Sequence, residues 1–376
     1  MDNVTKPELV INTSQLLSLI KGLSSQTSVA VDTESNSLYA YREQVCLIQF
    51  SIPGTDYLVD PLALQDIQPL GKVFSDPAVE KVFHAAEYDL LTLKRDFGFT
   101  FKNIFDTMVA ARILGRSKVG LGSILEEEFG VVLQKKYQRA NWGRRPLPKD
   151  MLNYASKDTH YLLQLRQRLF DELQQRDLLP LAREDFNRLC TINGNGPEPS
   201  LPNIWRMRGV KDLTPEKATV LKYLVEYRQK RAEKTDLPLF KVFNDKTLVA
   251  IAAACPGAIV ELKHIPGMTS KNINRHGKGL LSAVKRGLRD QPSYPPRRPR
   301  LDDAHAERLE ALRQWRKERA RKMGVESDVV LPRDVMEDLA YHNPSDLQQT
   351  SEIMHDLPWR MDKYGPEITK ILTRQT

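Results

Sequence analysis

Three groups of residues in the first half of the chain place carboxylates where they could bind a metal ion or move a proton. Asp32 and Glu34 end an apolar run, residues 28–31, that predicts a strand. Because residues i and i+2 of a strand point to one face, the two carboxylates should converge. Two carboxylates at such a short distance resist ionising unless a cation lies between them. A site with only oxygen ligands suits Mg²⁺ or Mn²⁺. Taken alone, the pair is also explained by a helix cap or a loop hydrogen bond.

The other two groups lie on predicted helices. Asp89 follows a predicted strand, residues 81–84, and falls in the first turn of a predicted helix over 88–97, where an acid could merely complement the helix dipole. Tyr154 and Asp158 are four residues apart in a predicted helix over 149–173, so the phenol and the carboxylate share one face. Asp158 lies among leucines, although a plain exposed acid is the alternative there.

The elements that must position these residues predict an α/β domain over the first 200 residues. Strands expected at 28–31, 45–50 and 57–59 follow one another closely, which favours an antiparallel meander. A helix over 64–74 and the strand 81–84 come next, followed by helices at 88–97, 106–114, 120–129 and 149–173. A meander followed by strand–helix alternation indicates a mixed sheet flanked by helices.

The remainder of the chain is almost purely helical and contains an internal repeat. Leu221, Leu224 and Tyr227-Arg228 recur 88 residues later as Leu309, Leu312 and Trp315-Arg316, and the register holds across more than fifty residues. The chain therefore carries two copies of one small helical domain. A glycine-containing stretch, 193–197, and a proline- and arginine-rich stretch, 292–300, are typical of linkers.

Charge is unevenly distributed along the 376 residues. The net charge is +8, but residues 1–200 carry −2, residues 201–300 carry +13 and residues 301–376 carry −3. Such localised basicity indicates a polyanionic partner, with a merely solvated basic face as the alternative. Three scattered cysteines suit neither disulfides nor zinc, and neither an apolar span nor a signal segment is evident. We expect a cytoplasmic protein without membrane contact.

The order Asp-x-Glu, then Asp, then Tyr-x-x-x-Asp resembles the DEDD superfamily of 3′→5′ exonucleases. The match is to its tyrosine-bearing branch and, within that, to the ribonuclease D family. Three neighbouring segments strengthen it: His84-Ala85-Ala86, Phe105-Asp106-Thr107 and Trp142-Gly143-Arg144-Arg145-Pro146-Leu147. The helical repeats resemble two helicase-and-ribonuclease-D C-terminal (HRDC) domains, of which the second lacks the basic charge of the first.

The resemblance implies both a fold and a domain order. The fold is an α/β ribonuclease H-like exonuclease domain with a mixed sheet, followed by two small all-α HRDC domains. We expect the exonuclease domain over 1–195, a linker over 196–212, the basic first HRDC domain over 213–291, a second linker over 292–302 and the second HRDC-like domain over 303–376.

The resemblance also implies an activity. Asp32, Glu34, Asp89 and Asp158 would hold two divalent ions, Mg²⁺ or Mn²⁺, while Tyr154 would orient the attacking water. With a reference pKa of about 10, a phenol is a poor general base and a better positioning group. The expected enzyme is a monomeric exoribonuclease that trims 3′ trailers of precursor tRNAs and other small structured RNAs and releases nucleoside 5′-monophosphates.

Cations interleaved with aromatic residues suit the binding of a single-stranded nucleic acid, because cations bind phosphate and flat rings stack on unpaired bases. The alternative is that the aromatic residues are core anchors. We expect the acidic second HRDC copy to pack against the nuclease domain or to shape a ring. The candidate RNA-binding residues are Gln49, Phe50, His84, Tyr137, Arg139, Trp142 and Arg144 in the first domain, and Lys271, Arg275 and Lys278 near Gly267 and Gly277 in the first HRDC copy.

Two other functions remain open at this stage. A DEDD exonuclease acting on DNA 3′ ends would carry the same acids, since no residue here can be assigned to the 2′-hydroxyl. A non-catalytic RNA-binding scaffold should have lost one of the acids, and all four acids and Tyr154 are present.

Overall fold

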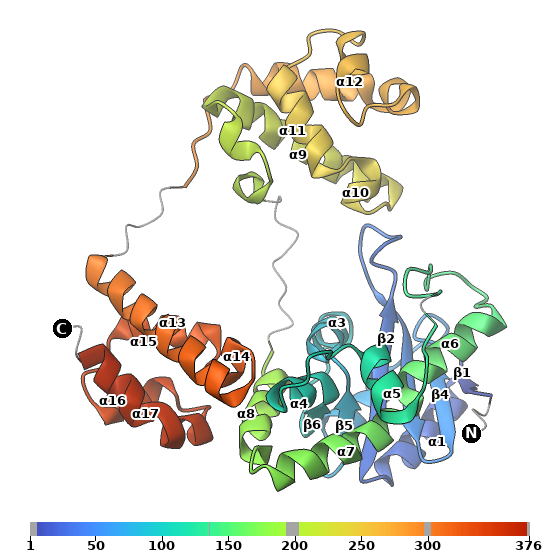
Figure 1. Cartoon of the computed structure of the whole chain (residues 1–376). Helices are drawn as coiled ribbons and strands as arrows, with labels where there is room; N and C mark the ends of the chain where they lie inside the picture. The colour runs from blue at the N-terminus through green and yellow to red at the C-terminus, as the bar shows by residue number, and fades with distance from the viewer. Residues whose placement is uncertain (1–5, 135, 193–202, 297–301, 374–376) are drawn as a thin grey trace. The chain divides into compact units, whose positions relative to one another are not determined.

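The computed structural model describes residues 6–134, 136–192, 203–296 and 302–373. These residues form two compact units. The first unit takes in residues 1–35, 45–196 and 300–376 and contains the sheet and the C-terminal helices (Figure 1). The second takes in residues 36–44 and 197–299.

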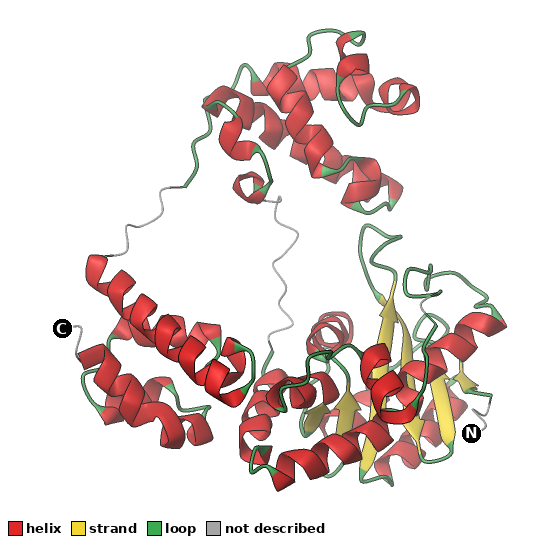
Figure 2. Ribbon diagram, viewed as in Figure 1, coloured by secondary structure: helices red, strands yellow, loops and turns green. Residues whose placement is uncertain are grey.

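A six-stranded mixed sheet forms the centre of the first unit (Figure 2), with the strand order β1-β4-β3-β2-β5-β6. The strands β2 (Ser28–Ser35), β3 (Val45–Ile52) and β4 (Thr55–Val59) form the antiparallel meander that the sequence predicts. β5 (Glu80–Phe83) pairs with β2 in parallel, which confirms the mixed sheet. The edge strands β1 (Glu8–Val10) and β6 (Ile104–Asp106) are too short for an alternating pattern to predict.

The two faces of β2 belong to different cores. Val29 and Val31 are buried in a core that also contains side chains of α1 (Thr13–Ser24) and α3 (Glu87–Phe97). Ala30 faces the opposite side, where α7 (Leu162–Gln175) contributes its leucines. Because side chains alternate along a strand, Asp32 and Glu34 lie on the Ala30 face and Thr33 on the Val31 face.

Two expected helices are wrong in extent. In place of a helix over 64–74, a 3₁₀ turn η1 (Gln68–Leu70) leads into the short α2 (Gly71–Ser75). The helix expected over 149–173 is two helices, α6 (Lys149–His160) and α7, separated at Tyr161. The break lets each helix bury its own face: α6 packs on β3 and β4, and α7 packs its leucines in the core beside Ala30.

Two further helices lie close to the ranges that the sequence predicts: α4 (Thr107–Ile113) and α5 (Leu121–Phe129). A third, α8 (Leu179–Cys190), was not among the expected elements.

The C-terminal helices repeat with the separation found in the sequence. α9 (Pro215–Thr235), α10 (Leu239–Val242), α11 (Asp245–Ala254) and α12 (Ser270–Gly287) begin 88 residues before α13 (Asp303–Met323), α14 (Ser327–Val330), α15 (Arg333–His342) and α17 (Pro358–Thr373), respectively. The second copy also contains α16 (Leu347–Ile353), at the place of the 3₁₀ turn η4 (Glu261–His264). Each copy has its own apolar core.

The linker expected over 196–212 is shorter than predicted. Residues from 204 form the 3₁₀ turns η2 (Ile204–Arg206) and η3 (Val210–Asp212), and Ile204, Met207 and Val210 are buried in the core of the first copy. Residues 193–202 of the first linker and 297–301 of the second lie outside the described residues. In the part of the chain that the structure describes, no helix combines the length and the apolar character that crossing a membrane requires.

Candidate active site

The strand β2 delivers the first two acids to one face of the sheet. β2 lies inside the sheet between β3 and β5, and its buried residues Val29 to Val31 fix the register in which Asp32 follows. The register with β3 shifts between Glu34 and Ser35, so the regular antiparallel register ends at the second acid. Asp32 and Glu34 therefore lie near the end of β2, on the face that α6 and α7 cover.

The third acid, Asp89, reaches the site from the first turn of α3. Ala85, in the turn before that helix, has a positive φ of 62°. The buried carboxylate of Asp106 fixes this turn by accepting hydrogen bonds from the backbone N–H of Ala85 (3.1 Å) and Ala86 (2.7 Å). The hydroxyl of Thr33 donates to Asp89 Oδ1 from the α3 side of the sheet.

Asp106 has a structural role that the sequence pattern could not specify. Besides holding the turn before α3, it caps α4 by accepting from the N–H groups of Met108 (2.8 Å) and Val109 (3.1 Å). One buried carboxylate thus satisfies donors at the starts of two helices. Its position in the Phe105-Asp106-Thr107 segment was the available signal, but Ala85 and Ala86, which it also holds, are 20 or more residues away in the sequence.

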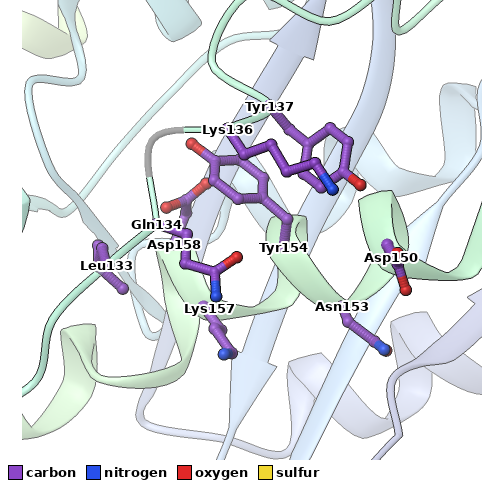
Figure 3. A pocket seen from close by; sticks show the side chains of 9 residues that line it. All are labelled: Leu133, Gln134, Lys136, Tyr137, Asp150, Asn153, Tyr154, Lys157 and Asp158. Atoms are coloured by element: carbon purple, nitrogen blue, oxygen red, sulfur yellow. The ribbon is translucent and has the colours of Figure 1, made fainter.

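Tyr154 and Asp158 lie one turn apart on α6, as predicted, and both line a pocket of about 610 Å³. Asp32 and His84 line the same pocket, which joins β2, the end of β5 and α6. A smaller neighbouring cavity of about 150 Å³ is shown in Figure 3, where Tyr154 and Asp158 lie near Lys136 and Tyr137. The Tyr154 ring packs edge-on against Tyr137, with a centroid distance of 5.7 Å.

Burial raises the pKa values of all four acids, and neighbouring charges raise those of Asp32, Glu34 and Asp89 further. Burial raises the pKa of Glu34 to about 10, with further contributions from the charges of Asp32, Asp158 and Asp89. Burial likewise raises the pKa of Asp158 to about 7. The pKa values of Asp32 and Asp89 are also raised, first by burial and then by the nearby charges of Asp158 and Asp32, respectively. A divalent cation would reverse this penalty by favouring the ionised carboxylates.

The donor set fits hard divalent ions. All four groups are carboxylates, the ligand type that Mg²⁺ and Mn²⁺ prefer. Among the residues that the structure describes, no three carboxylate, imidazole or thiolate groups are already arranged to enclose an ion.

Tyr154 is suited to positioning rather than to proton abstraction. Burial and the neighbouring charges of Asp158, Glu34 and Asp32 raise the pKa of its phenol above the ordinary value. The group therefore stays protonated near neutral pH and can hydrogen-bond a water molecule without removing its proton.

Comparison with known proteins agrees with this geometry. Residues 7–174 match the 3′–5′ exonuclease family, and residues 217–284 and 305–372 each match the HRDC domain. The two HRDC matches begin 88 residues apart. The chain belongs to the DEDD family of 3′→5′ exonucleases. Within that family it has the ribonuclease D architecture, an exonuclease domain followed by two HRDC domains, and the family uses divalent metal ions.

Relatives of this DEDD exonuclease include bacterial and eukaryotic proteins. Ribonuclease D of Gluconacetobacter diazotrophicus is 29% identical over 281 residues, which cover 74% of this chain and 71% of that protein. The exosome complex exonuclease RRP6 of Saccharomyces cerevisiae is 29% identical over 299 residues, 76% of this chain but 41% of that protein. The chain thus spans half or less of the length of the RRP6-like relatives.

Solved structures show the same fold. The structure of Escherichia coli RNase D covers 98% of this chain and is itself covered to 99%, with a TM-score of 0.71 and 24% identity. The catalytic core of RRP6 from Trypanosoma brucei covers 77% of this chain, with 81% of that chain covered, a TM-score of 0.67 and 28% identity.

Several residues predicted to bind RNA are buried in this DEDD exonuclease, and those predictions are wrong for direct contact. Phe50 pairs with Val31 across the strands, so its ring lies in the core on the face opposite to the acids. Gln49 pairs with Asp32 and shares its face, but its side chain is fully buried. Trp142 is 1% exposed and packs against Tyr154, as a core anchor would.

The other predicted RNA-binding residues fall into two groups. His84 lines the pocket, Tyr137 lies beside Tyr154, and Arg139 and Arg144 are exposed on the segment that leads to α6. Lys271, Arg275 and Lys278 are exposed on α12, in the other unit. Of the two glycines near these residues, Gly277 lies inside α12 and packs against Leu262, whereas Gly267 precedes that helix with a φ of +86°.

Arg145 fixes the segment that enters α6. Its guanidinium donates to both carboxylate oxygens of Asp60, at 2.6 and 2.7 Å, and to the backbone oxygens of Cys46 and Trp142. Asp60 is 4% exposed, so its carboxylate is shielded from water, whereas the Arg145 side chain stays 28% exposed. The consecutive arginines of the sequence motif therefore differ: Arg145 is structural and Arg144 is free to face solvent.

A buried polar network anchors the other end of α6. His160 Nδ1 lies 2.8 Å from Asp56 Oδ2, and Ser51 Oγ lies 2.6 Å from Asp56 Oδ1. Ser51 Oγ also lies 2.7 Å from Thr159 Oγ1, in the residue that follows Asp158. Asp56 is 2% exposed, so its carboxylate depends on these partners. His160 and Asp56 are therefore candidate positioning residues for Asp158.

We expect His160→Ala to lower kcat about tenfold or more with little change in KM for RNA, because the His160–Asp56 contact anchors the last turn of α6, which carries Asp158, and a misplacement of about 1 Å can cost about a hundredfold in rate. His160→Gln should restore most of the rate, since its amide can still donate to Asp56. Thr350→Val provides the control: it removes a buried hydroxyl contact of 2.7 Å with Thr369 in the second HRDC copy. Steady-state kinetics on a labelled RNA would contradict the role if His160→Ala behaved like this control.

Proposed function

We propose that the chain is a metal-dependent 3′→5′ exoribonuclease of the ribonuclease D type, releasing nucleoside 5′-monophosphates one at a time. The observation that carries the proposal is that Asp32, Tyr154 and Asp158 line one pocket and that the charges of Glu34 and Asp89 interact with these acids, although the residues come from three separate elements. The family match over residues 7–174 and the ribonuclease D relative support it.

The side chains of the site have different roles in hydrolysis. Asp32, Glu34, Asp89 and Asp158 would hold two divalent ions, Mg²⁺ or Mn²⁺, which supply activation of water and stabilisation of the charge on the phosphate and the departing 3′ oxygen. Tyr154, kept protonated by its raised pKa, orients the attacking water by a hydrogen bond. Asp106, Asp56 and His160 keep α3 and α6 in the places that bring their acids together.

We propose RNA as the substrate, in particular precursor tRNA 3′ trailers and other small structured RNAs. The basic first HRDC copy supports a polyanion, and Lys271, Arg275 and Lys278 would contact the RNA body. Tyr137, Arg139 and Arg144 would contact the single strand near the pocket. We also propose that the protein acts as a monomer in the cytoplasm.

The domain division that we propose starts from the ranges expected from the sequence. The exonuclease domain covers 1–195, the first HRDC domain 213–291 and the second 303–376. The turns η2 and η3, whose residues lie in the core of the first copy, shorten the linker before it.

The experiment that tests the function compares RNA with DNA. A precursor tRNA with a short 3′ trailer and a DNA strand with the same tail are incubated with the protein in Mg²⁺, in Mn²⁺ and in EDTA, and the 3′ ends are mapped over time. We expect stepwise loss of mononucleotides from RNA and none in EDTA. Equal or faster trimming of DNA would instead indicate an exonuclease that acts on DNA 3′ ends. No hydrolysis of either substrate would favour a non-catalytic RNA-binding scaffold.

A further inference from the structure

The side-chain amide of Gln49 is buried and has no hydrogen-bond partner among the described residues. The residue is 0% exposed, and both Nε2 and Oε1 are unpaired there. A buried amide that stays unpaired loses its hydrogen bonds to water without compensation. A leucine or a methionine would fill the same space without that cost. The amide therefore conflicts with the packing of its own layer, and such conflicts are typical of functional positions.

The register of the sheet places this amide opposite the first acid of the site. Gln49 of β3 pairs with Asp32 of β2, and Leu47, two residues earlier, pairs with Glu34. Residues directly opposite each other in an antiparallel pair point to the same face, with Cβ atoms about 4.5–5.5 Å apart. The Gln49 side chain is one methylene longer than that of Asp32. Its amide can therefore reach the carboxylate across the strand pair.

Helix α6 covers the same amide. Ser51, two residues after Gln49 on the same face of β3, has its Oγ 2.7 Å from Thr159 Oγ1 of α6. Leu58, which pairs with Gln49 from β4, shares a core with Ala155 of α6. Gln49 therefore lies beneath the last turns of α6, which carry the fourth acid, while the first acid is its neighbour on β2.

A second buried group in this layer lacks a partner of the complementary kind. The indole N–H of Trp142 is buried and, within the described part of the chain, has no acceptor. Trp142 belongs to the core that contains Leu47 and Leu58, the residues that flank Gln49. A glutamine amide can satisfy such an N–H with its carbonyl oxygen and still offer two N–H donors to a carboxylate.

We propose that Gln49 is a positioning residue for Asp32 in the ion-bound protein. Its Nε2–H donates to the Asp32 carboxylate, and its Oε1 accepts from the indole N–H of Trp142. Groups that hydrogen-bond the outer oxygens of metal ligands fix the orientation of those ligands. The inference rests on the proposed function and deepens it, because it names a residue that holds the first acid in place for the divalent ions.

Two other roles for the amide fit the observations less well. Direct contact with RNA is excluded by the complete burial of Gln49. A hydrogen bond to a buried water would satisfy the amide without any help from the acids. The two arrangements differ measurably, because a water-bound amide stabilises the fold whether or not ions are present. An amide that serves Asp32 contributes once ions draw that carboxylate into position.

The test combines calorimetric titration of the full chain with Mn²⁺ and thermal unfolding in EDTA. Gln49→Met keeps the length of the side chain and removes both polar atoms. It should weaken Mn²⁺ binding about tenfold or more, because outer partners of metal ligands typically contribute about 10–100-fold. It should also lower kcat on a labelled RNA in limiting Mn²⁺ and leave KM for RNA unchanged. In EDTA it should melt at the wild-type temperature or up to about 4 °C above it, since an unpaired buried amide has been removed.

Two controls match these changes in place and in chemistry. Leu47→Met introduces the same side chain on the same buried face of β3, opposite Glu34, without removing a polar group, and should bind Mn²⁺ like the wild type. Trp142→Phe removes the donor to Gln49 and should also weaken Mn²⁺ binding. Trp315→Phe removes another buried, unpaired indole N–H, in the core of the second HRDC copy, and should leave Mn²⁺ binding unchanged.

The inference is overturned if Gln49→Met binds Mn²⁺ as tightly as Leu47→Met does. It is also overturned if Gln49→Met melts below both the wild type and Leu47→Met in EDTA, since the amide would then be paired without ions. Unchanged Mn²⁺ affinity in Trp142→Phe would refute the contact between the indole and Gln49.

The same measurements keep this inference separate from the proposed function. A wild-type chain that binds Mn²⁺ and hydrolyses RNA, while Gln49→Met matches its control, refutes only the role of Gln49. A wild-type chain that neither binds Mn²⁺ nor hydrolyses RNA refutes the function itself.

Discussion

An Asp32→Asn variant is expected to lose hydrolysis of a 3′-tailed RNA by about three orders of magnitude or more. Asp32 lines the pocket with Tyr154 and Asp158, and the loss of one carboxylate removes both a ligand and a negative charge from the group that would hold the ions. Metal ions stabilise the transition state by several kcal/mol, and each 1.36 kcal/mol corresponds to a tenfold change in rate.

The measurement is single-turnover hydrolysis in Mg²⁺, with RNA affinity measured separately. The control is Asp171→Asn, which neutralises an exposed acid of α7 whose contact is with Gln167 on the same helix. Asp32→Asn should bind RNA as well as the wild type does. Wild-type rates for Asp32→Asn would refute the assignment of the acids, since no other described group could replace a lost carboxylate at the end of β2.

An Asp158→Asn variant is expected to be more stable than the wild type when metal is removed, although it is inactive. The raised pKa of Asp158, about 7, means that the folded chain keeps a proton that the unfolded chain has already released. Stability therefore falls as the pH rises from about 4 to about 7, because the folded state binds more protons over that range. The similarly raised pKa of Glu34 extends the loss to higher pH.

Thermal unfolding in EDTA at pH 5 and pH 8 measures this effect. At pH 8 we expect Asp158→Asn to melt about 3–6 °C above the wild type, and the gap to shrink at pH 5, where the wild-type carboxyl is mostly protonated. Added Mg²⁺ should raise the melting temperature of the wild type more than that of the variant. A variant that melts below the wild type at both pH values would show that burial does not penalise the ionised form of Asp158 as described.

The local patterns of the chain were sufficient to predict that the candidate acids of β2 share one face and that Tyr154 and Asp158 of α6 share another. Asp32 and Glu34 share a face because a strand alternates with period two, and Tyr154 and Asp158 share a face because a helix turns every 3.6 residues. Both relations hold within a few residues, so they are readable without knowledge of the fold. The 88-residue repeat is similarly readable, since each copy repeats its own helix pattern.

Predictions of what RNA touches failed where burial depends on distant partners. Phe50 and Trp142 are aromatic residues near the motif, and nothing local distinguishes a stacking platform from a core anchor. The pairing of Phe50 with Val31 decides the first case, and the packing of Trp142 on Tyr154 decides the second. The break at Tyr161 was hidden for the same reason, because the two halves of one leucine-rich segment bury different faces.

By itself, the sequence determined the identity of the acids, the tyrosine that accompanies them, the mixed sheet and the duplicated helical domain. Each of these follows from spacing within one element or from repetition along the chain. Only the tertiary structure decided that Asp106 and Asp56 hold the site together, and that Arg360 of the second HRDC copy pairs with Glu184 and Asp185 of α8. Those assignments depend on which distant charges become neighbours, and only folding brings them together.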